Sequence, residues 1–86
     1  MSMVCGQIIC IENVGSIERG TISPGKWYTI DKIILKTVDG KRKTRYAVCE
    51  NGTWKTNQRL TLREARNRVA ELHEEYIASK YYAMYI

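Results

Sequence analysis

The chain has 86 residues, of which 44% are hydrophobic and 27% charged, and its formal net charge is +5. Domains rarely fall below about 50 residues, so this length allows a single domain, and the composition excludes a disordered chain. The longest apolar runs, residues 8–11 and 33–35, are far shorter than the roughly 18 residues of a membrane span. No secretory signal is recognisable, so we expect one soluble cytoplasmic domain over residues 1–86.

The first two thirds of the chain favour β-structure, and we place the β-rich part at residues 3–57. The β-branched segment 4–12 predicts a first strand, and the glycine-containing segment 13–26 predicts a loop that ends in a Pro24-Gly25 turn. Residues 27–37 predict a second strand. Its apolar phase changes from Ile30 to Ile33, which favours a bulge or bend.

Two turn signals follow. Asp39-Gly40 and Asn51-Gly52 are typical of tight hairpin turns, whose two central residues take positive φ. They predict a third strand over residues 43–50 and a fourth over 53–57, with Trp54 as its large packing residue. Two adjacent hairpins indicate an antiparallel meander, which could close partly into a barrel.

The last third predicts one helix over about residues 61–80. Thr61 and Glu64 have the spacing of a capping box, in which each side chain bonds an amide at the helix start. A stripe that could cover the sheet recurs at three- and four-residue steps: Leu62, Ala65, Val69, Leu72 and Tyr76. The predicted fold class is therefore α+β, a small antiparallel meander or partly closed barrel followed by one C-terminal α-helix.

Positive charge is concentrated in the middle of the chain. Between residues 32 and 68 there are eleven lysines and arginines against three acids, whereas the remaining residues carry more acids than bases. A basic two-stranded ribbon can follow a phosphate backbone or enter a nucleic-acid groove. Candidate residues for binding nucleic acid or another anion lie at the first hairpin turn, beyond it and in the helix start: Lys41, Arg42, Lys43, Arg45, Lys55, Arg59, Arg63 and Arg66.

The helix carries its charges in an unusual order. Arginines occupy its first turns, where the helix dipole favours acids, and Glu71, Glu74 and Glu75 come later. One interpretation is a solvated helix face, partly compensated by Glu64 four residues before Arg68. The other is an anion site at the helix start, where amides and guanidinium groups point at one ligand.

Aromatic residues supply a second candidate surface. Four of the six tyrosines lie in the last eleven residues. They could pack on the chain's own core, or they could contact a partner or a second copy, because tyrosine is enriched at interfaces. The candidate interface residues are Trp54, Tyr81, Tyr82 and Tyr85.

No feature of the sequence requires catalysis or a cofactor. His73 has no neighbouring nucleophile, and phosphate-binding glycine loops and metal-binding helix motifs are missing. Cys5, Cys10 and Cys49 are interpreted as small buried thiols, since the paired spacing of zinc knuckles is absent. We expect a protein that is not an enzyme and holds no metal.

Two segments resemble known families. Cys10-Ile11-Glu12-Asn13, residues 21–30 from Thr21 to Ile30 and Tyr46-Ala47-Val48 before Asn51-Gly52 resemble short phage and mobile-element proteins with a barrel of the Src-homology-3 kind. Asp39-Gly40-Lys41-Arg42-Lys43 and Thr61-Leu62-Arg63-Glu64-Ala65 are similar to the arm-binding domains of phage tyrosine recombinases. That second resemblance implies DNA contacts at Lys41, Arg42, Lys43 and Arg45.

Two functions follow as hypotheses. The first is a non-catalytic phage-type protein that binds DNA, RNA or a nucleotide ligand through the basic hairpin and the helix start. The second is a phage-encoded inhibitor that blocks a host defence or metabolic protein through an aromatic surface, working in the host cytoplasm. The sequence leaves the partner's identity and the oligomeric state open.

Overall fold

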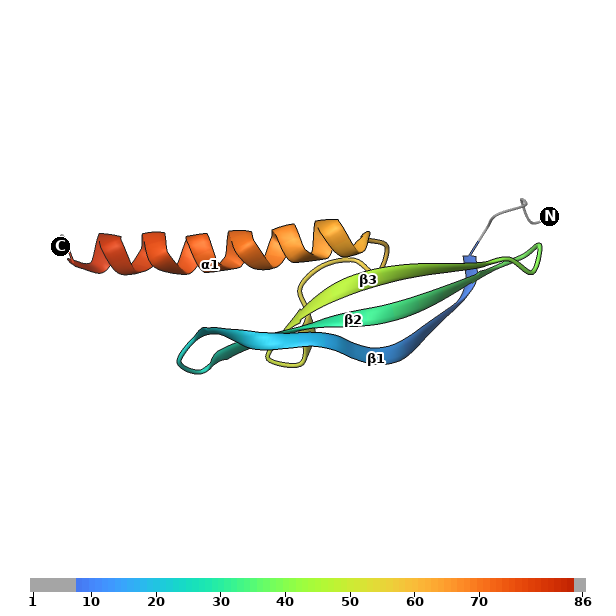
Figure 1. Cartoon of the computed structure of the whole chain (residues 1–86), viewed down its shortest axis with the longest axis horizontal. Coiled ribbons are helices and arrows are strands. Elements are labelled where there is room, and N and C mark those ends of the chain that lie inside the picture. The colour runs from blue at the N-terminus through green and yellow to red at the C-terminus, as the bar shows by residue number, and fades with distance from the viewer. Residues whose placement is uncertain (1–7, 85–86) are drawn as a thin grey trace.

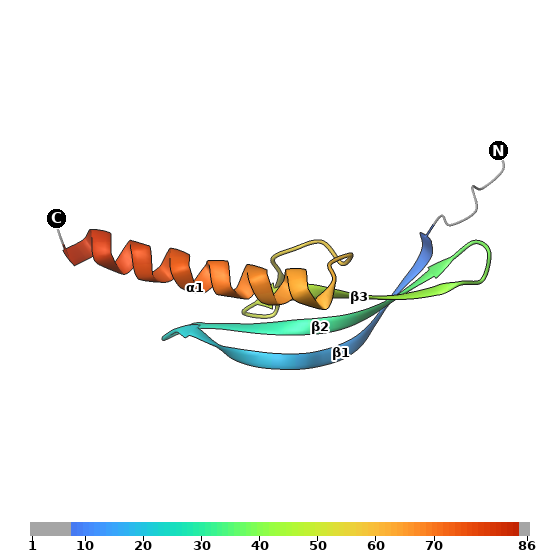
Figure 2. The ribbon, with the colours of Figure 1, turned by 45° about the horizontal axis from the view of Figure 1, so that its top comes forward.

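The computed structural model describes residues 8–84, with side chains for residues 8–80, and has an α+β fold (Figure 1). Four antiparallel strands follow each other in the sheet as they do in the chain: β1 (Ile8–Ser23), β2 (Lys26–Thr37), β3 (Arg42–Glu50) and β4 (Thr53–Trp54). The sheet curls into half a barrel, and one helix, α1 (Leu62–Met84), follows it. Figure 2 shows the bowed path of β1 beneath β2 and β3.

β1 is longer than the predicted first strand over residues 4–12. It continues to Ser23, through most of the segment 13–26 that the sequence predicts to be a loop. Gly15 is accommodated by its φ of 131°, and Asn13 Oδ1 accepts a hydrogen bond from its amide at 2.9 Å. Four register shifts leave one β1 residue unpaired each time, at positions 9, 14, 17 and 22. Bulges of this kind let a glycine-containing edge strand follow a curved partner. Of the predicted first strand, residues 4–7 lie outside the described residues.

β2 is regular, so the predicted bulge in this strand is wrong. The change of apolar phase has another cause: both faces of β2 are buried. Ile30 faces α1 together with its cross-strand partner Val48, whereas Ile33 and Leu35 lie on the opposite face with Ala47. We call these the helix face and the rear face of the sheet. Because side chains alternate along a strand, the even-numbered residues of β2 and β3 lie on the helix face and the odd-numbered residues on the rear face.

The three turns lie where the sequence places them. Gly25 has a φ of 80° after Pro24, and Asn51 and Gly52 have φ values of 52° and 83°, as a tight hairpin turn requires. The turn between β2 and β3, at Asp39-Gly40, differs from the expected two-residue turn. There only Gly40 has a positive φ, and Gly40 N donates to Thr37 O at 3.0 Å, so the loop is longer.

β4 spans two residues instead of the predicted five. Lys55 N still donates to Val48 O at 2.8 Å, and Thr56 Oγ1 accepts the Val48 amide, but the chain then leaves the sheet. Leu60 returns to the same edge and exchanges two backbone hydrogen bonds with Tyr46. The free edge of β3 is therefore covered next to the start of α1.

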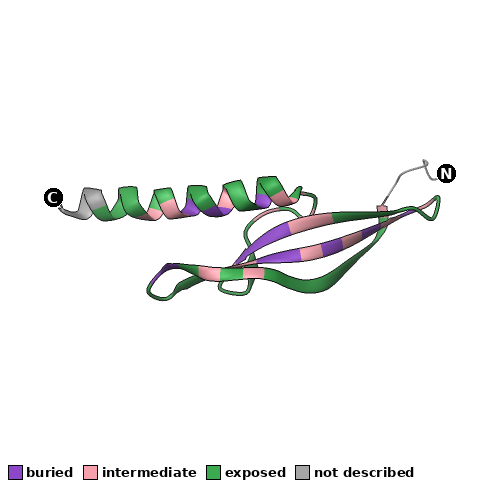
Figure 3. Ribbon diagram, in the orientation of Figure 1, coloured by how far each residue is buried: buried purple, intermediate pink, exposed green. Residues whose placement is uncertain are grey.

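The helix start and its apolar stripe confirm their predictions. Thr61 N donates to Glu64 Oε1 at 3.0 Å, and Glu64 N donates to Thr61 Oγ1 at 3.2 Å, which forms the capping box. The five stripe residues pack against Ile22, Ile30 and Val48 as the main core. Figure 3 shows the buried residues of α1 along the side that faces the sheet, whereas residues 77–80 are exposed.

No helix in the described part of the chain is both long and apolar enough to cross a membrane. The molecule extends 58 Å along its longest axis and 23 Å across. The β2–β3 hairpin lies at one end and the C-terminal end of α1 at the other (Figure 1). This arrangement separates the hairpin turn from the acids late in the helix, whereas Glu64 in its first turn lies close enough to Arg45 for the guanidinium to help lower the pKa of Glu64.

Candidate functional site

The arginines of the first helical turns are largely engaged with carboxylates. The Arg66 guanidinium bonds Glu18 of β1 through Nε at 2.8 Å and through Nη2, and this contact raises the pKa of Arg66. Arg68 Nη1 lies 3.0 Å from Glu71 and 3.2 Å from Glu75. Arg63 is exposed and forms no ion pair with the described residues. A cluster of free guanidinium groups at the helix start is therefore not present.

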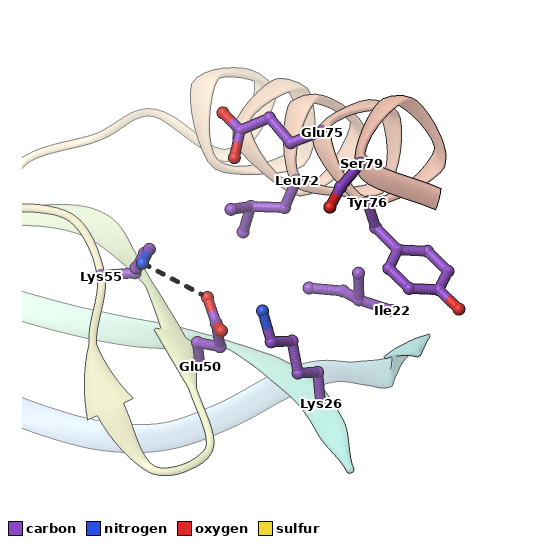
Figure 4. A pocket seen from close by; sticks show the side chains of 8 residues that line it. All are labelled: Ile22, Lys26, Glu50, Lys55, Leu72, Glu75, Tyr76 and Ser79. Atoms are coloured by element: carbon purple, nitrogen blue, oxygen red, sulfur yellow. Dashed lines mark ion pairs between the residues drawn. The ribbon is translucent and has the colours of Figure 1, made fainter. Parts of the chain in front are cut away.

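Lys55 is also engaged. Its Nζ lies 3.6 Å from Glu50 at a small pocket of about 160 Å³ between α1 and the sheet (Figure 4). Lys26 points into the same pocket, and Glu75 lines it from the helix. The positive charge of Lys55 is thus offset locally. Arg59, on the connection to α1, is exposed, and its amide donates to Asn57 Oδ1 at 2.8 Å.

The β2–β3 hairpin carries the least neutralised charge. Arg42, Lys43 and Arg45 form no ion pair within residues 8–84, and Lys41 lies 3.9 Å from Asp39 with 77% of its side chain exposed. Asp39 is held mainly by the Thr37 hydroxyl, which lowers the pKa of its carboxyl. Arg45 Nη1 donates to Thr44 O at 2.7 Å. The hairpin is exposed at one end of the molecule (Figure 3).

The hairpin cations lie on both faces of the ribbon. Register pairs Arg42 with Lys36 on the helix face, and it pairs Lys43 with Leu35 on the rear face. Lys36 is 3.6 Å from Glu12, a pair with both side chains at least 37% exposed. An exposed pair of this kind opens at little cost, because water screens it. Cations on both faces of the strand pair can contact phosphates from either side.

The strand acids are distributed unequally between the two faces. Glu12, Glu18 and Glu50 pair in register with helix-face residues of β2, and each has a basic partner there. On the rear face the strands carry one carboxylate, Asp31, which is 8% exposed. The rear face therefore presents little negative charge to solvent.

Asp31 is the centre of a hydrogen-bonded group on the rear face. Asn13 Nδ2 and Ser16 Oγ donate to its carboxylate at 3.0 and 2.9 Å, and Cys49 Sγ donates at 3.5 Å. Burial favours the neutral acid, but these hydrogen bonds outweigh it and lower the pKa of Asp31. Burial and the nearby Asp31 charge raise the pKa of Cys49 to about 11. The group joins β1 to β2 and β3 and keeps Cys49 a thiol.

The candidate interface residues are only partly described. Trp54 is 46% exposed on β4. The side chains of Tyr81 and Tyr82 and the whole of Tyr85 lie outside the described residues, so the tyrosine surface stays a prediction. Ile77, one turn before Tyr81, is 54% exposed, so this part of α1 does not pack on the sheet.

The cysteines correct one prediction in part. Cys49 is buried as expected, whereas Cys10 is exposed because it lies on the solvated edge strand β1. Cys5 lies outside the described residues. Within residues 8–84, no three histidine, cysteine or acidic side chains come together as metal ligands.

Sequence reasoning missed Arg19 and Trp27 as surface residues. Arg19 pairs in register with Thr29 on the rear face and forms no ion pair with the described residues. Trp27 is on the same face and is 46% exposed. Arg19 lay in the segment predicted to be a loop, so no alternation pattern could assign it to a face. The exposed indole had no signal in the sequence, because tryptophan usually packs.

Comparison of the chain with known protein families, curated proteins and solved structures found no match. The two resemblances to phage proteins therefore stay predictions.

Proposed function

We propose that this protein is a non-catalytic nucleic-acid-binding protein whose β2–β3 hairpin contacts the phosphate backbone. The observation that supports this most directly is the contrast between the hairpin and the helix start. Arg42, Lys43 and Arg45 form no ion pair with a carboxylate among residues 8–84, whereas Lys55 and Arg66 each pair with one and Arg68 pairs with two. Lys43 and Arg45 act more weakly on Asp39 and Glu64, whose pKa values they help to lower. A polyanion gains most from cations that no protein carboxylate already neutralises.

The position of the hairpin supports the same function. The hairpin turn lies at one end of the molecule and the C-terminal end of α1 at the other (Figure 1), so the acids late in α1 do not repel a ligand that approaches the turn. At the level of Arg42 and Lys43 the sheet is three strands wide, because Cys10 and Ile11 of β1 pair with Lys36 and Leu35 of β2. The turn between β2 and β3 extends beyond this sheet and is open to a phosphate backbone. The phage origin and the cytoplasmic location belong to the same proposal and are supported by the resemblances alone.

The test removes two free hairpin cations and compares the result with the loss of two cations elsewhere. Arg42→Gln with Lys43→Gln should weaken binding to a labelled oligonucleotide at least about tenfold in low salt, because two phosphate contacts are lost. The matched control, Lys55→Gln with Lys80→Gln, has the same net charge and should bind within about twofold of the unchanged protein. Fluorescence anisotropy measures both affinities.

Equal weakening by the two variants would show that only net charge matters, and it would contradict a hairpin interface. No binding by the unchanged protein at low salt would contradict the function as a whole. In that case the second candidate function, inhibition of a host protein through an aromatic surface, takes its place. The half-exposed Trp54 favours that candidate, and binding of this kind would change little with salt.

A further inference from the structure

The rear face carries a second surface, away from the hairpin, where two aromatic rings and one cation occur together. Trp27 and Trp54 are each 46% exposed. Trp27 precedes Thr29 on β2, and Trp54 pairs with Cys49, which in turn pairs with Thr29. Both indoles therefore lie on the rear face, at the end of the sheet opposite the hairpin tip. Strand spacing and rise place their Cα atoms roughly 12 Å apart.

The backbone around Trp27 is held in place. Its amide donates to Asn51 Oδ1 at 3.0 Å, and its carbonyl accepts the Asn51 amide at 2.9 Å. Asn51 Nδ2 also donates to Gly25 O at 3.0 Å, so one asparagine joins the β1–β2 and β3–β4 turns. A Cβ on Gly52 would lie 3.8 Å from the edge of the Trp27 ring. An aromatic ring supported by a rigid turn needs little ordering before a ligand stacks on it.

A depression of about 470 Å³ lies beside Trp27, between β1 and β2. Trp27 and Thr29 line it from one strand, and Arg19 and Thr21 line it from the other. The depression thus combines a flat apolar wall, two hydroxyl groups and a cation without a carboxylate partner in the described chain. These groups match a planar base attached to a sugar and a phosphate.

Charge on the rear face favours the same ligand. Arg19 and Lys43 are exposed there, and the only strand carboxylate on this face, Asp31, is 8% exposed and fully hydrogen-bonded. Duplex bases are stacked on each other and cannot cover an exposed indole. The bases of a single strand are free to do so, and every base has a face that stacks on an aromatic ring.

From this geometry we infer that the nucleic acid bound by this protein is single-stranded, with bases stacked on Trp27 and Trp54 and a phosphate at Arg19. The inference rests on the proposed function, since the hairpin supplies further phosphate contacts. It adds a class of ligand and a second site. Trp27 lies about 26 Å from Leu35, the β2 partner of Lys43, because eight residues of strand separate them and each adds about 3.3 Å.

The test compares a labelled oligothymidylate of about 20 nucleotides, longer than the sites of most small single-strand-binding domains, with a duplex of equal length. Trp27→Leu and Trp54→Leu should each weaken single-strand binding by about 5- to 150-fold, the range that loss of one base–aromatic stack produces. Trp27→Tyr, which keeps an aromatic ring, should restore most of the affinity. Ile77→Ala, an exposed apolar residue on α1, is the matched control and should bind normally.

Tryptophan fluorescence gives an independent readout, because stacked bases quench an indole. The single strand should quench both tryptophans, and each leucine variant should lose its share of the quenching. Free nucleotides form another arm: their binding with equal strength would show that a nucleotide suffices and would overturn the need for a strand.

The failures are distinguishable. Equal affinity for duplex and single strand without quenching would overturn this inference and leave the hairpin function standing. Absence of binding to either oligonucleotide would contradict both. Capture of a protein through the tryptophans, with no nucleic-acid binding, would assign the aromatic surface to the second candidate function and overturn the inference.

Discussion

The substitution Gly20→Ala tests whether β1 and α1 are coupled through the ring of Tyr28. A Cβ at Gly20 would lie 2.7 Å from Tyr28 Oη and 2.8 and 2.9 Å from two ring carbons. Tyr28 packs against the main core, and its ring meets His73 of α1 edge-on with centroids 6.1 Å apart. The ring must therefore shift when Gly20 becomes alanine, and the shift disturbs the contact with α1.

The magnitude follows from two opposing effects. Overpacking costs about 1–3 kcal/mol, whereas alanine restricts the unfolded chain and contributes about 0.4–1 kcal/mol of stability. Gly20 has no positive φ, so its backbone does not oppose the substitution. Gly20→Ala should therefore lower the free energy of unfolding by between about 0 and 2.6 kcal/mol. Urea denaturation followed by tryptophan fluorescence measures this change.

The double variant removes the cause. Tyr28→Leu lacks the three atoms that the new Cβ would meet, so Gly20→Ala in that background should be neutral or stabilising by up to about 1 kcal/mol. The coupling energy between the two sites should reach about 1–3 kcal/mol. A coupling energy near zero between Gly20→Ala and Tyr28→Leu would refute the close approach of Tyr28 to β1.

Two further predictions concern the helix start and the buried thiol. Thr61→Ala removes the hydroxyl half of the capping box, so it should lower the free energy of unfolding by about 1 kcal/mol. The amide of residue 61, the main cause of the depressed pKa of Glu64, remains, so that pKa should rise only part of the way toward 4.5 in an NMR titration. Unchanged stability would contradict the cap. In a Cys5→Ser background, a thiol reagent should label the exposed Cys10 rapidly and Cys49 only on unfolding. Equal labelling rates for Cys10 and Cys49 in the folded protein would contradict the burial of Cys49. Because the pKa of Cys49 rises from 9.0 to about 11 on folding, the contribution of this thiol to stability should be complete below pH 9 and lost as the pH rises toward 11.

Local signals in the sequence predicted the positions of the turns and the helix correctly, although the turn at Asp39-Gly40 is longer than predicted. Pro24-Gly25, Asn51-Gly52 and the pair Thr61 and Glu64 act over a few residues, through φ preferences and short hydrogen bonds. Such features depend little on the remainder of the chain. The meander and the C-terminal helix could therefore be predicted with nearly correct boundaries.

β1 could not be predicted in this way. Gly15 and Gly20 have the composition of a loop, yet the strand accommodates them, one in a bulge and one beneath the Tyr28 ring. Both adaptations depend on β2, which lies later in the chain. Tertiary context here overrides local propensity.

The candidate site shows the same division. The basic residues of the hairpin could be recognised from the sequence, because they follow one another around a turn. Which basic residues form ion pairs could not be recognised, because residues distant in the sequence decide it. Arg66 and its partner Glu18 are 48 residues apart. To predict that Trp27 and Arg19 share the rear face, the register between β1 and β2 must be known. The bulges in β1 shift this register, so it cannot be derived from the sequence alone.

The central claim is that hairpin cations contact phosphates, and the salt dependence of binding measures the number of such contacts. Five contacts, four from Lys41, Arg42, Lys43 and Arg45 and one from Arg19, give a slope of log K against log salt of about −3.5 for a single strand, so affinity falls about 130-fold between 50 and 200 mM salt. The account predicts that Arg42→Gln with Lys43→Gln reduces the slope to about −2.1. An unchanged slope in this variant would contradict it.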